Sequence, residues 1–262
     1  MLLETLLISI VMAFATAIQS LVGFGMALFA VPLLLLLGVD LSPAVFIVLS
    51  ISLCSSLIGV RRLRAALDFK RAAGASLLRA IGVIPGYATA LALEESSPAN
   101  IKAGIAFAVG LGVAAQARGL VLRRREGTEA VEREVEPSKR AEPFAFLSSG
   151  YLMGWLGMGG PPLVFWLLSG RQDPKTTRSF LYAVYILTIP FQLSIMIFHD
   201  PSILSSTLPV LMVAVPTSLL TSMATLRFGD ELDVDRLQWL SLLLLTLLTL
   251  KALADWLQYM WG

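Results

Sequence analysis

The chain has 262 residues, of which 56% are hydrophobic and 15% charged, and its formal net charge is +2. A soluble globular protein has about 45–50% apolar and about 25% charged residues, so this composition excludes the soluble class and indicates several membrane crossings. The small net charge gives no reason to expect a nucleic-acid partner. Cys54 is the only cysteine, which excludes an intramolecular disulfide.

The first apolar segment extends from Leu2 to Leu37 and is interrupted at Gly23 and Gly25. A straight helix of this length would measure about 50 Å, whereas the hydrocarbon core of a bilayer is about 30 Å thick. We therefore expect the segment to kink strongly or to fold back as a hairpin. Three further spans are predicted at residues 44–60, 72–93 and 101–117.

A hydrophilic stretch at residues 126–142 divides the chain into halves of similar length. Its charges of both signs and Pro137 are typical of a solvated linker. We predict a first transmembrane repeat at 1–122, a charged cytoplasmic linker at 123–142 and a second transmembrane repeat at 143–262.

The second half opens with an apolar segment, Pro143 to Ser169, that contains a run of glycines and prolines between residues 150 and 162. Glycine costs about 1 kcal/mol and proline about 3 kcal/mol inside a helix. Leu-Gly-Met-Gly at 156–159 aligns with Val-Gly-Phe-Gly at 22–25. Interrupted apolar segments at matching places in two halves point to a transporter binding site. Further spans are predicted at 179–198, 203–226 and 237–257.

Lysine and arginine gather in the loops at 61–71, 118–140, 171–178 and 227–236, and are absent from the turns at 38–43, 94–100 and 199–202. All four basic loops lie in the cytoplasm only if the segment at 143–169 is a re-entrant pair of half-helices, so we prefer this over a full crossing, which stays open. The expected fold is an all-α polytopic protein of the inner cell membrane. It has two inverted repeats, each a broken or re-entrant glycine-rich helical segment plus three transmembrane helices.

A helix that restarts after such a break, for example at Pro161, directs free N–H groups and the positive end of its dipole at the tip. Two such tips near the midplane would form an anion site. Polar groups nearby either bind the substrate or bond a neighbouring helix, and Arg79 and Arg178 are either anion guides or membrane anchors. The predicted substrate-binding residues are Gln19, Ser20, Gly23, Phe24, Gly25, Gly157, Met158, Gly159, Gly160, Pro161, Tyr182, Tyr185 and Gln192.

The motif at 22–25 through Pro32, followed by Pro43-Ala44 and the serines at 50–56, resembles the sulfite exporter TauE/SafE family. Leu-Gly-Met-Gly-Gly-Pro at 156–161 is similar to the glycine motif in the second half of that family. The resemblance implies export of sulfite, a small organosulfonate or a related anion. The alternatives are transport of another small anion or carboxylate, and a non-transporting membrane subunit.

An enzyme is not expected, because Ser148 and Ser149 lie far along the chain from the only histidine, His199, and no nucleophile–base pair is evident. No catalytic residue, metal site or cofactor is predicted. Few acidic residues fall within the spans, so we expect efflux driven by the membrane potential rather than by an embedded proton relay. The expected partners are a small anionic substrate and the lipid bilayer, and a homodimer is compatible with the sequence.

Overall fold

The structure is a computed structural model of the chain. It describes residues 2–64, 68–94, 104, 106–107, 109–114, 117–118, 136–167, 169–170, 173–228, 243, 246–247, 250 and 254. Every element within these residues is a helix. The predicted spans at 101–117 and 237–257 lie largely outside the described residues, as does the part of the predicted linker at 123–135.

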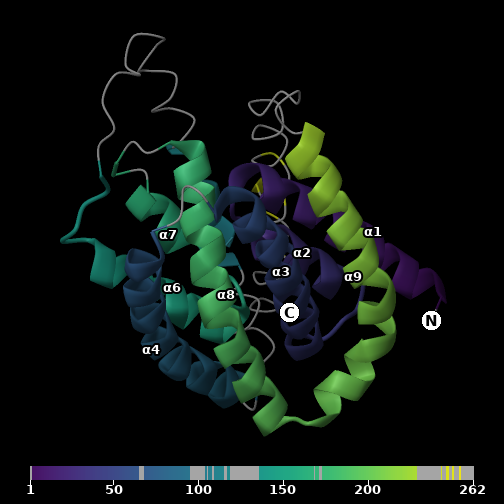
Figure 1. The fold of residues 1–262 in the computed structure, drawn as a ribbon. Coiled ribbons are helices and arrows are strands. Elements are labelled where there is room, and N and C mark those ends of the chain that lie inside the picture. The colour runs from purple at the N-terminus through teal and green to yellow at the C-terminus, as the bar shows by residue number, and fades with distance from the viewer. Residues whose placement is uncertain are drawn as a thin grey trace. The chain divides into compact units, whose positions relative to one another are not determined.

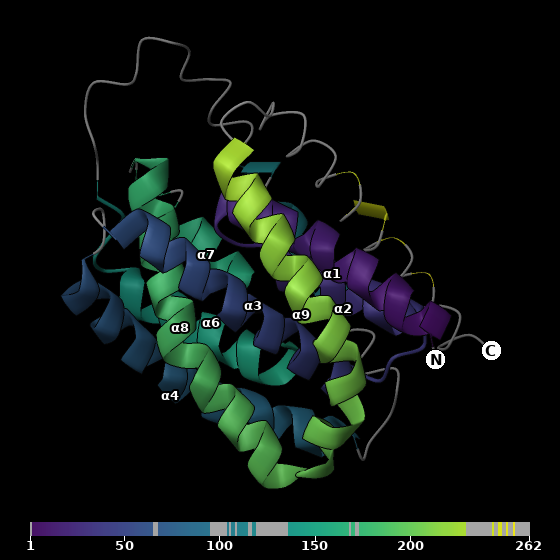
Figure 2. The ribbon, with the colours of Figure 1, turned by 45° about the vertical axis from the view of Figure 1, so that its right-hand side comes forward.

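The helices group into two compact units. The first unit comprises residues 1–80 and 174–232 (Figure 1). In it α1 lies along α9, and α3 contacts both α8 and α9 (Figure 2). Its complete helices are α1 (Leu2–Val22), α2 (Met26–Leu36), α3 (Leu41–Leu63), α8 (Pro174–His199) and α9 (Ser202–Phe228).

The second unit comprises residues 81–173 and 233–262. It contains the larger part of α4 (Phe69–Glu94), whose first turns belong to the first unit. It also contains α6 (Glu142–Leu156) and α7 (Gly160–Leu167), which pack against each other.

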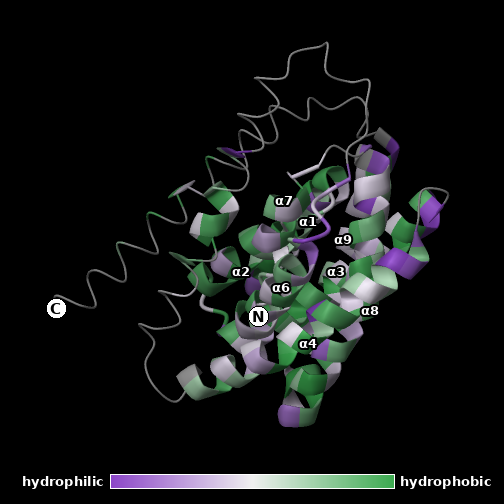
Figure 3. Cartoon of the chain, turned by 90° about the vertical axis from the view of Figure 1, so that its left-hand side faces the viewer, coloured by the Kyte–Doolittle hydropathy of each residue, from purple (hydrophilic) through white to green (hydrophobic). Residues whose placement is uncertain are grey.

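Five described helices are long and apolar enough to cross a membrane: residues 3–22, 41–63, 69–92, 175–199 and 202–227. Figure 3 shows apolar residues along most of their length. By contrast α2 has 11 residues and α7 has 8, so they measure about 16 Å and about 12 Å. Both are far shorter than the hydrocarbon core, which is about 30 Å thick.

The predicted spans at 44–60, 72–93, 179–198 and 203–226 are all helical, and each helix continues past the apolar run at one or both ends. α3 extends through Arg61 and Arg62, which are favourable next to the negative end of the helix dipole. α3 also starts three residues before the predicted span at 44–60, with Asp40 as N-cap. Proline is tolerated in the first turn of a helix, so Pro43 does not have to begin one.

One end of the first unit is basic. The end of α3 and the start of α8 meet there, since Ser179 Oγ donates to the Leu63 carbonyl at 3.1 Å. The ends of α1 and α9 meet where Ser20 Oγ donates to Ser222 Oγ at 3.1 Å. Three of the predicted basic loops therefore begin or end at one end of this unit. The basic residues there are Arg61, Arg62, Lys175, Arg178 and Arg227.

Candidate functional site

The first interruption follows α1. Gly23 N–H donates to the Gln19 carbonyl at 2.7 Å and completes the last turn. Gly23 and Gly25 have φ of 91° and 104°, in the left-handed region that side chains disfavour, and α2 begins at Met26. The helix is therefore interrupted at the two glycines that the sequence analysis identified, with Phe24 half-buried between them.

The carbonyl end of α1 is held by two side chains of α8. The Tyr182 hydroxyl donates to the carbonyls of Gln19 at 3.1 Å and Ser20 at 3.3 Å. Arg178 Nη1 donates to the carbonyls of Ser20 and Leu21, at 3.4 Å each. The last carbonyls of a helix have no partner within it, and a positive charge there is favourable. The contacts therefore stabilise the point at which α1 ends.

Two glycines make room for these side chains. The Tyr182 ring is buried directly against Gly59 of α3, where any Cβ would overlap it. A Cβ on Gly23 would lie 2.9 Å from Cγ of Arg178. Gly23 is thus required both for its backbone angle and for the close approach of α8.

Buried hydroxyls and one amide surround the end of α1. Gln19 accepts from Ser52 Oγ at 3.2 Å and donates to Ser56 Oγ at 3.4 Å, both on α3. Thr16 on α1 and Ser218 on α9 are also fully buried, yet within the described residues their hydroxyls have no hydrogen-bond partner. The structure thus brings Gln19 into a larger polar cluster than the sequence predicted.

The start of α2 offers hydrogen-bond donors. Its N-cap is Gly25, and no side chain caps it. The first intrahelical bond at this end is from Phe29 N–H to the Gly25 carbonyl at 3.3 Å, so Met26, Ala27 and Leu28 precede it. The first N–H groups of a helix have no partner within it and attract anions.

The second interruption follows α6. Gly157 has φ of 71°, its N–H donates to the Met153 carbonyl at 2.8 Å, and Met158 N–H donates to the Leu152 carbonyl at 3.3 Å. The bond from Gly157 N–H to the Met153 carbonyl is that of the αL motif, in which a left-handed glycine ends a helix. The Gly159 carbonyl accepts from Ser149 Oγ. Glycine in the left-handed region therefore ends the first helix of each segment.

The two interruptions differ in their donors. α7 begins at Gly160, one residue before the predicted Pro161, and continues with Pro161 and Pro162. Proline has no N–H, so two of the first three positions of α7 have no donor. The two helix starts therefore differ in the number of N–H donors that they offer to an anion. The start of α2 has more of these donors than the start of α7.

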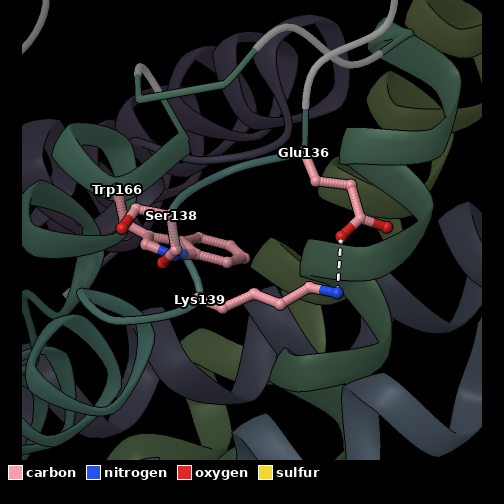
Figure 4. Close-up of polar contacts among 4 residues, drawn as sticks. All are labelled: Glu136, Ser138, Lys139 and Trp166. Carbon is pink, nitrogen blue, oxygen red and sulfur yellow. Dashed lines mark hydrogen bonds and ion pairs between the residues drawn. The ribbon is translucent and has the colours of Figure 1, made fainter.

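The chain before α6 is bonded to the end of α7 and the chain after it, and Figure 4 shows Ser138 beside Trp166 of α7. Ser138 N–H donates to Ser169 Oγ at 3.0 Å, and Trp166 Nε1 donates to the Ser138 carbonyl at 3.0 Å. Lys139 Nζ lies 3.2 Å from Glu136 Oε2 beside them. We call the Ser138–Ser169–Trp166 contacts the hairpin base. Entry to and exit from the segment thus lie side by side.

The close packing of α4 on α6 through glycines was not predicted from the sequence. Gly150 and Gly154 of α6 face Gly82 and Gly86 of α4, and a Cβ on Gly82, Gly86 or Gly154 would overlap backbone atoms of the other helix. The four-residue spacing in each pair is the known signal for close helix contact in membranes. Gly154 therefore serves helix packing, whereas Gly157 serves the turn.

The remaining predicted residues lie elsewhere. Arg79 and Tyr185 are buried together, with Arg79 Cζ 5.0 Å from the ring centroid. Gln192 is buried ten positions beyond Tyr182, about 15 Å along α8, and so is not near the first interruption. Substrate contact by all the predicted residues, and a midplane site formed by both interruptions, stay predictions.

Long apolar helices and two glycine-rich interruptions define a multi-pass helical membrane protein. The chain belongs to the family described as sulfite exporter TauE/SafE, whose family model matches residues 8–252. Membership implies a membrane transporter of sulfur-containing anions, and it confirms the resemblance seen in the sequence motifs. Comparisons with curated proteins and with solved structures found no match.

Proposed function

We propose that the protein exports a small sulfur-containing anion, sulfite or an organosulfonate, across the inner cell membrane, and that the anion binds at the helix interruptions. The observation that carries this proposal is the start of α2. Three consecutive residues with N–H groups, Met26 to Leu28, follow a glycine tip that has no capping side chain. Arg178 lies against the same tip.

The chemistry of such a tip suits an oxyanion. Backbone N–H groups and the helix dipole attract the oxygens of sulfite or a sulfonate, and the glycines allow close approach. Arg178 adds a positive charge that is already hydrogen-bonded to carbonyls of α1. Because the site depends on dipoles and one shared cation, it can release the anion as well as bind it.

Two inverted repeats are supported by how each segment packs. The interrupted segment of each half packs against the second long helix that follows the interrupted segment of the other half. α1 lies along α9, and α6 contacts α4. Thr16 and Ser20 precede Gly23 by seven and three positions, as Gly150 and Gly154 precede Gly157. We therefore keep repeats at 1–122 and 143–262, joined by the linker at 123–142.

A re-entrant form of the second segment is supported by the hairpin base. A single crossing would separate residues 138 and 169 by the thickness of the membrane, whereas they are hydrogen-bonded. With this hairpin, all the basic loops lie on one side, which the distribution of lysine and arginine assigns to the cytoplasm, together with the linker.

Replacing Ala27 by proline is expected to weaken anion binding about tenfold, because a hydrogen bond to a charged group contributes about 1.5–3 kcal/mol. The change deletes one N–H in the first turn of α2 and introduces the residue that the second segment has at the matching position, Pro161. Ala27→Val retains the N–H at similar volume and is the matched control. Binding is measured as thermal shift of purified protein with sulfite, taurine, sulfoacetate, sulfate and acetate.

Four outcomes of this measurement are distinguished. A shift with a sulfur oxyanion that falls in Ala27→Pro but survives in Ala27→Val supports the proposed site. An equal shift in both variants moves the site away from α2. A shift with acetate alone replaces the sulfur anion by a carboxylate, and no shift with any anion overturns the proposal.

Efflux is expected to follow the membrane potential. An interior-negative potential of about 100 mV favours outward movement of one negative charge by about 2.3 kcal/mol, nearly fiftyfold, without a coupled ion. Collapsing the potential in sulfite-loaded vesicles with valinomycin and potassium should therefore slow efflux. The same vesicles with an imposed pH gradient are the control, and efflux that responds to pH alone would contradict the prediction.

A further inference from the structure

Hydroxyl groups inside the helices of this protein generally bond to their own backbone. Ser76, Thr188 and Thr207 each donate to the carbonyl four residues earlier. This local bond satisfies a hydroxyl that has no access to water. Thr16 and Ser218 are fully buried at 0% exposure, but neither makes this bond or any other within the described residues. Both therefore retain an unused donor and acceptor.

The two exceptions belong to one place in the first unit. Thr16 is one helical turn before Ser20, and Ser218 is one turn before Ser222, while Ser20 Oγ donates to Ser222 Oγ at 3.1 Å. α1 and α9 run in the same direction in both ribbon views (Figures 1 and 2). The unused hydroxyls of Thr16 and Ser218 therefore both lie on the N-terminal side of the Ser20–Ser222 bond. We call these four residues the hydroxyl cluster.

Helix packing does not require the hydroxyls. At the matching crossing of α6 with α4 in the second unit, the corresponding small residues are glycines: Gly150 and Gly154 face Gly82 and Gly86. Small side chains without polar atoms therefore suffice for such a contact. A buried hydroxyl without a partner destabilises the fold. Destabilising residues of this kind are tolerated where they serve function.

We propose that the hydroxyl cluster binds an oxygen of the transported oxyanion, at a position on α1 and α9 one to two turns before the glycine tip. The inference rests on the proposed function and adds a second, uncharged binding position to it. The unused hydroxyls of Thr16 and Ser218 are neutral, so they donate hydrogen bonds to an anion without attracting it so strongly that release becomes slow. The anion moves from the N–H groups at the start of α2 to these hydroxyls without meeting a carboxylate on either helix, because the only acidic residue in α1 or α9 is Glu4.

The double variant Thr16→Val with Ser218→Ala tests the proposal, since it removes only the two unused hydroxyls at nearly unchanged volume. Its melting temperature without anion should equal or exceed that of the wild type, because two unsatisfied buried groups are gone. The KM for sulfite efflux should rise at least tenfold, and the thermal shift with sulfite should shrink. Thr207→Val and Ser76→Ala are the controls, and they should keep KM and the shift unchanged.

The outcomes separate this inference from the proposed function. An unchanged KM and shift in the double variant overturns the hydroxyl site while transport stands. A melting temperature well below that of the wild type also overturns it, because the hydroxyls would then hold α1 and α9 together. If the wild type neither binds nor transports sulfite or a sulfonate, the proposed function itself fails.

Discussion

Replacing Gly154 by alanine is expected to destabilise the protein severely. The added Cβ would overlap the Val83 carbonyl oxygen and approach the backbone of Tyr87, and backbone atoms within two packed helices cannot move aside. Overpacking of this kind costs about 1–3 kcal/mol and occasionally more. The melting temperature of purified protein in detergent should fall by many degrees, and size-exclusion chromatography should show loss of the monodisperse species.

Gly74→Ala is the matched control, because Gly74 lies in α4 with open space around its Cα. In a helix interior alanine is favoured over glycine by about 0.5–1 kcal/mol, so this variant should be as stable as the wild type or slightly more so. If Gly154→Ala and Gly74→Ala behaved alike, the close contact between α4 and α6 described here would be wrong.

Replacing Tyr182 by phenylalanine should give the second large effect. The ring would stay against Gly59, but the carbonyls of Gln19 and Ser20 would lose the donor at the end of α1. Gly23 N–H and Arg178 Nη1 still donate to these carbonyls, so the change removes one buried hydrogen bond, worth about 0.5–1.5 kcal/mol, which no water replaces inside a membrane. We expect a lower melting temperature and faster hydrogen exchange in the last turn of α1.

The adjacent tyrosine of α8 supplies the control for this experiment. Tyr185→Phe keeps the ring that lies over Arg79, so the buried cation–π contact is retained. Its effect on stability should be small beside that of Tyr182→Phe. Equal losses in the two variants would mean that the hydroxyl of Tyr182 has no special part in ending α1.

The course of the helices could be predicted well from the sequence. Apolar runs at 44–60 and 179–198 correspond to α3 and α8, because lipid and helix-facing positions both need apolar side chains. The ends were less predictable. α8 begins five residues before its predicted start, since Lys175 and Arg178 can extend their charged heads from a helix while their stems stay apolar.

The site was predictable only in part. Gly23, Gly25 and Gly157 are turn glycines as their setting indicates, because positive φ at a break is a local property of the chain. The four-residue spacing of Gly150 and Gly154 is a local signal for helix packing, but it does not show that the partner of Gly154 is Val83 of α4. Thr16 and Ser218 look like ordinary small residues until the structure reveals that their hydroxyls lack the usual local bond.

The hairpin base has a mechanical consequence. Because Ser138, Ser169 and Trp166 join the two legs of the α6–α7 pair, and Phe146 stacks edge-on against Trp166 with centroids 5.2 Å apart, the legs cannot splay. The pair must then tilt as one lever about its base. A displacement of the chain just before Ser138 would then be transmitted along α6 to the turn at Gly157.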